Sequence, residues 1–343
     1  MKRRIFNFPV CMRTPLQVAL IGITALAGTL AAQTNMTAAE SHGEQNADFA
    51  KAEIHVLPVQ GNIYMVVGDG ANITLQAGKQ GEVLVNTGFD KMSAKLIAAI
   101  KKYSDRPLQY IINTNSYPDS TSGNDLVKDA GTTITGANVT NDIKDSRDGA
   151  QILAQENVLI RMSAPTGQKS PTPDGAWPTD TFLGNEKPLF FNGESIRIIH
   201  QPSALTDGDS IVYFRRSDVI SAGDLFNTDG YPVIDFAKGG SIEGTVLALT
   251  NIVNLAIVEH EEEGGTLVIP GHGHLCDQAE VVEYRDMVAI VRDRIKAMIK
   301  DGMTLEQVKA AKPTLDYDPL YGHNSYWTPD MFIEEAYKSL KKS

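Results

Sequence analysis

The stretch NTNSYPDSTSGN at residues 113–124 carries the most informative pattern of the chain. It follows directly on the apolar run YII at residues 110–112, which is typical of a buried strand. The ends of strands are where α/β folds gather functional side chains, so a polar stretch in this place is a candidate site. Asp119 is its strongest member, because a carboxylate can bind a metal ion.

Two later strand-like runs are each followed by a further possible metal ligand. Asp224 follows the run at residues 218–221, and His272 follows the run TLVI at residues 266–269. Together with Asp119 they form a set of two carboxylates and one imidazole, which suits a borderline divalent cation such as Zn²⁺. Asp and glycine-flanked His are also common in turns, so these residues alone leave a turn role open.

The sequence around these runs predicts two similar halves. Both halves begin with short β-rich runs separated by turns: residues 62–67, 72–77 and 82–85 in the first half, and residues 195–199, 210–214 and 218–221 in the second. An amphipathic helix near residues 92–100 follows the first set, and a helix from about Ser241 to Gly264 follows the second. Further helices start near Asp277 and at Thr304. We therefore expect a mixed α/β (α+β) chain folded as a four-layer αββα sandwich, with the two β-rich halves face to face and the helices outside.

The N-terminal residues have the layout of an export signal. Basic residues come first, and an uncharged stretch at residues 16–32 follows and ends in small side chains. We expect residues 1–32 to be a signal peptide that is removed, which places the protein in the periplasm or outside the cell. A single retained anchor helix is the alternative.

Three further segments follow the signal peptide. Residues 33–52 are polar and rich in Ala, Asn and Glu, which predicts a disordered linker. The αββα domain is expected over residues 53–300, and residues 301–343 are expected to form a C-terminal helical extension packed on that domain.

The composition excludes several classes of protein. The chain has 31 Lys+Arg and 42 Asp+Glu, a net charge of -11 that becomes -15 once the four basic residues of segment 1–32 are removed. So acidic a chain is a poor partner for nucleic acid. Its two cysteines, Cys11 and Cys276, cannot form a disulfide framework or a cysteine-rich zinc module. The mean hydropathy of -0.18 excludes a protein with many membrane spans, so we expect no membrane contact beyond the export signal. We expect the ligand or substrate to be a small molecule.

Four stretches in order resemble the successive motifs of the metallo-β-lactamase superfamily. They are residues 113–124, TDGDS at residues 206–210, SAGD at residues 221–224 and PGHG at residues 270–273. The resemblance spans about residues 55–290. It implies an αββα sandwich of two similar halves, and it implies hydrolysis of esters, thioesters, lactams or phosphoesters by one or two zinc ions.

The resemblance also implies that most of the family's metal ligands are missing. The family motif His-x-His-x-Asp-His falls on residues 115–120, where Asn115, Tyr117 and Ser120 stand in place of its histidines. A further expected histidine is Leu205. Since the first metal site of the family uses positions 115, 117 and 205, we expect that site to be lost. The second site would use positions 119, 120, 224 and 272, of which only Ser120 departs from the family pattern.

Two functions remain open at this stage. The first is a non-catalytic relative, a pseudoenzyme that binds a ligand in the periplasm; it is supported by five lost family positions, Asn86 included. The second is a mononuclear zinc hydrolase of an ester, thioester or lactam that uses Asp119, Asp224 and His272, with Asp119 as the candidate catalytic residue. The expected cofactor is accordingly none or a single zinc ion. Trp177, in a proline-rich segment at residues 160–180, is a candidate for the rim of the substrate cleft, with a plain surface connection as the alternative.

Overall fold

The computed structural model describes residues 48–132, 149–257 and 264–342. The predicted signal peptide and residues 33–47 of the predicted linker lie outside these described residues. The described end of that linker, residues 48–52, forms a turn held by Lys95, whose ammonium group donates hydrogen bonds to the carbonyls of Phe49, Ala50 and Ala52. Among the described residues, no helix combines the length and the apolar character that a membrane crossing requires.

Within the described residues, the first sheet has seven strands in sequence order: β1 (His55–Pro58), β2 (Ile63–Val67), β3 (Ile73–Ala77), β4 (Glu82–Val85), β5 (Leu108–Ile112), β6 (Gln151–Gln155) and β7 (Asp180–Phe182). Strands β1 to β4 form the antiparallel meander that the turns predicted. Strands β4 to β7 are parallel. Helices therefore connect the parallel strands, because a parallel pair needs a crossover.

The second sheet has the order β12-β11-β10-β9-β8. Its strands are β8 (Glu186–Phe191), β9 (Glu194–Gln201), β10 (Asp209–Phe214), β11 (Val219–Asn227) and β12 (Leu267–His272). Strands β8 to β11 are antiparallel to their neighbours, whereas β12 runs parallel to β11. Strand β11 is longer than predicted, so Asp224 lies inside it and not in a following loop.

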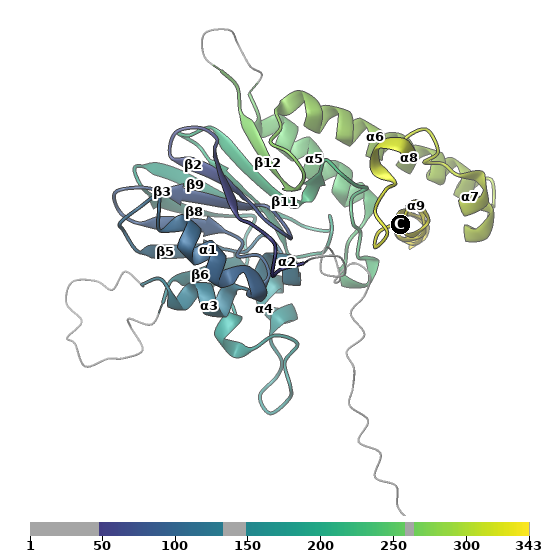
Figure 1. Cartoon of the computed structure of the whole chain (residues 1–343). Helices are drawn as coiled ribbons and strands as arrows, with labels where there is room; N and C mark the ends of the chain where they lie inside the picture. Colours follow the sequence, from purple (N-terminus) through teal and green to yellow (C-terminus); the bar gives the residue numbers. More distant parts are fainter. Residues whose placement is uncertain (1–47, 133–148, 258–263, 343) are drawn as a thin grey trace, which may run out of the picture. The chain divides into compact units, whose positions relative to one another are not determined.

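The helices lie outside the two sheets (Figure 1). They are α1 (Ser93–Ile100), α2 (Pro118–Thr121), α3 (Asn124–Asp129), α4 (Glu156–Met162), α5 (Ile242–Leu255), α6 (Gln278–Lys300), α7 (Leu305–Ala311), α8 (Asp318–Tyr321) and α9 (Pro329–Lys342). The polar stretch at residues 113–124 thus contains the short helix α2 and the start of α3. Helix α5 ends at Leu255, well before Gly264, because the backbone of Ala256 is extended.

Three apolar layers hold the sandwich together. On β4, Val83 and Val85 face the second sheet and pack with residues such as Val212, while Leu84 faces α1 and packs with Leu96. This alternation has the period of two expected for a strand with both faces buried. The third layer joins the second sheet to α5, α6, α7 and α9. These layers confirm the predicted four-layer αββα sandwich.

The C-terminal helices share the third layer. Phe332, Ile333 and Ala336 of α9 are buried in the same cluster as Ile252 of α5 and Val288 of α6. Capping boxes start α6 at Asp277 and α7 at Thr304, as the sequence predicts. The described residues of segment 301–342 therefore complete the core beside the second sheet.

Candidate metal centre

Three elements from distant parts of the sequence bring Asp119, Asp224 and His272 together. Asp119 lies on α2 directly after β5, Asp224 lies within β11, and His272 is the last residue of β12. His272 Nε2 lies 3.3 Å from Asp119 Oδ2 and 3.5 Å from Asp224 Oδ1. One possible ligand atom from each residue lies within 4.8 Å of the others. The three side chains are thus close enough to share one metal ion.

Gly271 makes room for the carboxylate of Asp224, and Gly223 shapes the backbone next to it. A Cβ atom on Gly271 would lie 2.5 Å from Asp224 Oδ1 and 2.7 Å from the carbonyl carbon and oxygen of Gly223. Gly223 itself has a φ of 55°, in the left-handed region that favours glycine. The pairing of β11 with β12 shifts register on both sides of Gly223, and such a bulge re-aims the side chains next to it. The glycines at 223 and 271 therefore determine where the Asp224 carboxylate points.

The side chains of Asn115 and Ser120 hold one oxygen of Asp224. Asn115 Nδ2 donates to Asp224 Oδ2 at 2.7 Å, and Ser120 Oγ donates to the same oxygen at 3.3 Å. The other oxygen, Oδ1, accepts no hydrogen bond from the described residues and lies beside His272. Two of the residues that replace family histidines therefore orient Asp224 from one side and leave its other oxygen toward the centre of the cluster.

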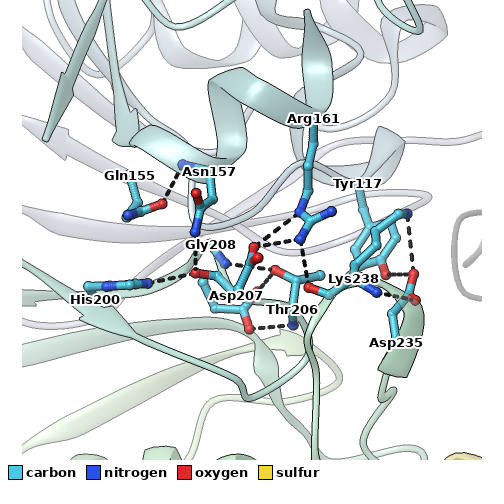
Figure 2. Close-up of polar contacts among 11 residues, drawn as sticks. Tyr117, Gln155, Asn157, Arg161, His200, Thr206, Asp207, Gly208, Asp235 and Lys238 are labelled. Carbon is cyan, nitrogen blue, oxygen red and sulfur yellow. Dashed lines mark hydrogen bonds and ion pairs between the residues drawn. The ribbon is translucent and has the colours of Figure 1, made fainter. Parts of the chain in front are cut away.

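Tyr117 and Leu205, the other two replacements, take part in a different contact network. Tyr117 Oη donates to Asp235 Oδ2 at 2.9 Å, and Lys238 Nζ lies 3.2 Å from that same oxygen. The ammonium group of Lys238 is also 4.7 Å from the centre of the Tyr117 ring (Figure 2). Leu205 is buried in the core beside the second sheet, and its carbonyl accepts a hydrogen bond from the backbone N–H of Asp235. Both replaced positions are thus joined to Asp235.

The turn at residues 206–209 fixes the position of Leu205. The backbone N–H of Thr206 donates to Asp209 Oδ2 at 2.7 Å, and its hydroxyl donates to Oδ1 at 2.9 Å. Arg161 of α4 binds Asp207 Oδ1 through two nitrogens, and His200 Nε2 contacts the Asp207 carbonyl (Figure 2). Burial raises the pKa of Asp209 to about 8. The turn at residues 206–209 therefore stabilises the fold around Leu205.

Asn86 also has a structural part. Its φ of 66° places it in the left-handed region, which Asn tolerates better than most residues. Its Oδ1 accepts from the Thr114 N–H and its Nδ2 donates to the Thr114 hydroxyl, both at 2.9 Å. Asn86 therefore fixes the start of the stretch that leads to Asp119.

The two carboxylates determine the protonation of His272. Burial lowers its pKa, but the hydrogen bond with Asp119 and the charges of Asp119 and Asp224 outweigh this and raise the pKa to about 10. Without a metal ion the imidazole therefore carries a proton that neutralises part of the carboxylate charge. A bound metal ion would replace this proton as the neutralising positive charge, because a histidine that binds a metal must be neutral.

Trp177 packs within the segment that the sequence singles out as a rim. Its indole N–H donates to the Thr172 carbonyl at 3.0 Å, and its ring packs against a small cluster that includes Val158 and Met162 of α4. These contacts anchor the segment on α4, and a role of Trp177 at a substrate rim stays a prediction.

The sequence alone did not draw attention to Asp235 and Lys238, although both contact Tyr117. Neither residue is near Tyr117 in the sequence, since Tyr117 and Asp235 are 118 residues apart. The segment around them has no pattern of its own that would have drawn attention to it.

Comparison with known proteins places this geometry in a family. A sequence profile of the metallo-β-lactamase superfamily matches residues 57–272. A linear primary-alkylsulfatase of Pseudomonas sp. (strain ATCC 19151) is 21% identical over 290 residues, which cover 76% of this chain and 53% of that protein.

Solved structures agree with the fold. A stereoselective inverting sec-alkylsulfatase from Pseudomonas sp. superimposes with a TM-score of 0.60 at 14% identity, covering 83% of this chain and 50% of that one. A metallo-β-lactamase from Pontibacter korlensis superimposes with a TM-score of 0.51 at 15% identity, covering 69% of this chain and 99% of that one. The chain thus spans about half the length of its alkylsulfatase relatives. The profile match covers well over half of the chain, and with it the αββα sandwich and the ordered motifs lead to one conclusion: the chain belongs to the metallo-β-lactamase superfamily.

Proposed function

We propose that the protein binds one divalent metal ion, zinc, through Asp119, Asp224 and His272, and that it is a non-catalytic, ligand-binding member of its superfamily. One contrast carries this proposal. Asn115 and Ser120 orient Asp224 toward the cluster, whereas Tyr117 and Leu205 are joined to Asp235. The cluster of Asp119, Asp224 and His272 is therefore kept in position. Tyr117 and Leu205, two replaced positions of the first family site, have instead become part of the fold.

The donor set fits a single ion. Two carboxylates and one imidazole are accepted zinc ligands, and Asp224 Oδ1 has no hydrogen bond from the described residues to compete with a metal. The hydrogen bond from Asn115 supplies the outer contact that commonly orients a metal-binding carboxylate. Zinc, when bound, would act as a Lewis acid that polarises an oxygen of a ligand.

The same donor set argues against strong catalysis. Asp119 and Asp224 together carry two negative charges, which cancel the charge of a divalent ion. The catalytic zinc sites of carbonic anhydrase and thermolysin use three histidines, or two histidines and one glutamate, and so carry at most one negative ligand. A neutralised centre withdraws less electron density from bound water. Asp119 would also have to serve as ligand and as base at once.

A second candidate function follows from the relatives. Two of them are alkylsulfatases by name, and the family as a whole points to hydrolysis, so a mononuclear hydrolase of a sulfate ester or another ester, thioester or lactam is the alternative. In that case the Asp119 carboxylate would hold the proton taken from the attacking water. Asn115 would keep Asp224 in place during the reaction.

Zinc analysis combined with turnover assays separates these functions. The purified protein is stripped with a chelator, reloaded with zinc and assayed with an alkyl sulfate, a carboxylic ester, a thioester and a β-lactam. The proposal expects Asp224→Asn to bind one zinc ion per chain fewer than the parent protein, whereas Asp105→Asn, a matched change at an exposed position, binds as many as the parent. It also expects no zinc-dependent turnover. Turnover that Asp224→Asn abolishes would establish the hydrolase instead, and the absence of bound zinc at saturating concentration would refute both.

Restoring histidines at 115, 117, 120 and 205 together tests what the replacements changed. If only the ligands of the first site are missing, the quadruple variant gains one zinc ion per chain over the parent protein, and hydrolase activity. A variant that folds and binds no additional ion would show that the surrounding fold has changed as well.

The export signal predicted from the sequence is the basis on which we propose a periplasmic or secreted location for this protein. The test is N-terminal sequencing of the protein recovered from the periplasmic fraction of an expressing cell. A start near residue 33 agrees with the proposal, and recovery of the intact N-terminus from the cytoplasm contradicts it.

A further inference from the structure

The segment that follows β12 brings a second set of metal-binding side chains together. Nε2 of His274, Sγ of Cys276 and a carboxylate oxygen of Glu280 lie within 4.8 Å of one another. None of these residues belongs to the cluster of Asp119, Asp224 and His272. Their donors are a nitrogen, a sulfur and an oxygen, in contrast to the two oxygens and one nitrogen of that cluster.

Each of the three residues is fixed by its own backbone or side-chain contacts. Cys276 pairs with Val268 of β12 through two backbone hydrogen bonds of 2.8 Å and 3.0 Å. The backbone N–H of His274 donates to the Thr228 hydroxyl at 3.1 Å. Glu280 is held by the capping box of α6, in which its Oε2 accepts from the backbone N–H of Asp277. The cluster is thus arranged before any ion binds.

The three donors can be compared with the spacing that a tetrahedral zinc ion requires. With Zn–S near 2.3 Å and Zn–N or Zn–O near 2.0–2.1 Å, ligand atoms lie about 3.3–3.7 Å apart. His274 Nε2 and Glu280 Oε1 are 2.8 Å apart and share a hydrogen bond. Small side-chain rotations therefore suffice to admit an ion between them and the sulfur.

We infer that His274, Cys276 and Glu280 form a second metal-binding site, for a borderline divalent cation of the zinc type. A thiolate and an imidazole select such an ion over Mg²⁺ and Ca²⁺, which prefer oxygen ligands. The side chains of His274 and Glu280 are 68% and 42% exposed, whereas Cys276 is only 2% exposed. The site opens to solvent on one side, where water completes the coordination.

The local charges favour the cation. Thiolate and carboxylate together neutralise a divalent ion, and the N-cap Asp277 adds a further negative charge beside them. These charges outweigh the partial positive charge of about 0.5 at the N-terminus of α6. On binding, the S–H bond that points to the His274 carbonyl breaks, its proton goes to solvent and the sulfur binds the metal.

Cobalt spectroscopy tests this site directly, because a thiolate bound to Co²⁺ gives a charge-transfer band in the near ultraviolet. The full chain carries Cys11→Ser, so that Cys276 is its only thiol. Asp224→Asn is added so that the cluster of Asp119, Asp224 and His272 does not compete. We expect one Co²⁺ ion per chain, a charge-transfer band that Zn²⁺ removes, and loss of the band in Cys276→Ser.

Variants at the exposed positions keep the test decisive even if Cys276→Ser disturbs packing. His274→Ala and Glu280→Gln each remove a direct ligand and should weaken Co²⁺ binding by more than the roughly 10–100-fold that loss of an outer contact costs. His55→Ala and Glu306→Gln, matched changes at exposed positions on other elements, should leave the affinity unchanged. Absence of the band, or an affinity that His274→Ala and Glu280→Gln do not alter, would overturn the inference.

Discussion

Replacing Gly271 by alanine tests whether this glycine sets the position of Asp224. The new Cβ would lie 2.5 Å from Asp224 Oδ1 and 2.7 Å from the carbonyl group of Gly223, closer than such atoms approach in proteins. Overpacking of this kind costs about 1–3 kcal/mol of folding free energy. The carboxylate must also move away, so zinc affinity should fall at least about tenfold, which corresponds to about 1.4 kcal/mol.

The assays are urea unfolding of the metal-free protein and a zinc titration of the folded protein. Gly184→Ala is the matched control, since a Cβ there meets no atom within 4 Å. A double-mutant cycle with Asp224→Ala separates the two contacts, because removal of the carboxylate leaves only the contact with Gly223. Gly271→Ala should therefore cost less stability in that background. If Gly271→Ala behaves like Gly184→Ala in both assays, the reasoning is refuted.

Three further substitutions test the rest of the structure. Tyr117→Phe removes a hydrogen bond to the buried Asp235 and should cost about 1.5–3 kcal/mol in urea unfolding without changing zinc affinity. The control Tyr284→Phe should cost only about 0.5–1.5 kcal/mol, because the Tyr284 hydroxyl donates to a neutral carbonyl. Loss of zinc in Tyr117→Phe would contradict this prediction. The pKa of His272 in the folded protein is raised to about 10, so in metal-free protein the protonated imidazole stabilises the fold below pH 6.5, and this stabilisation is lost as the pH rises to 10. The difference in unfolding free energy between the parent protein and His272→Gln should therefore shrink over that range. A difference that stays constant with pH would count against this prediction. Phe332→Ala should cost about 3–5 kcal/mol of folding free energy, because Phe332 is fully buried and stacks on Tyr231. Phe190, which is 75% exposed, should tolerate alanine. Equal losses of stability in the two variants, measured by thermal unfolding, would disprove this prediction.

The sequence was enough to predict the sandwich and the residues that form the cluster. Apolar runs with turns at regular spacing identified most strands, and the ligands follow such runs closely. Where it failed, pairing overrode local preference. The residues around Gly223 and Asp224 are poor strand formers, yet β11 continues through them, because Gly223 and Asn227 pair with Pro270 and His272 of β12. Strand β8 contains Pro188, which a strand tolerates there because β8 is at the edge of its sheet.

The contacts of the replaced ligands could not be predicted. Asn115 and Asp224 are 109 residues apart, and no local pattern shows that an amide will bind that carboxylate. Tyr117 reads as a lost histidine in the sequence, whereas its bond to Asp235 is a property of the folded chain alone. Local periodicity predicts elements, but pairs of polar side chains depend on how those elements are assembled.

Helix α9 has a consequence for the order in which the protein acquires its structure during synthesis. Phe332, Ile333 and Ala336 fill the layer outside the second sheet, and Ser339 accepts a hydrogen bond from the first residue of α5. Residues 329–342 leave the ribosome long after the strands of that sheet, at about 5–20 residues per second. The faces of α5, α6 and α7 that α9 covers therefore stay open until this helix has emerged. A nascent chain in that state exposes apolar side chains on one side, which keeps it available to chaperones.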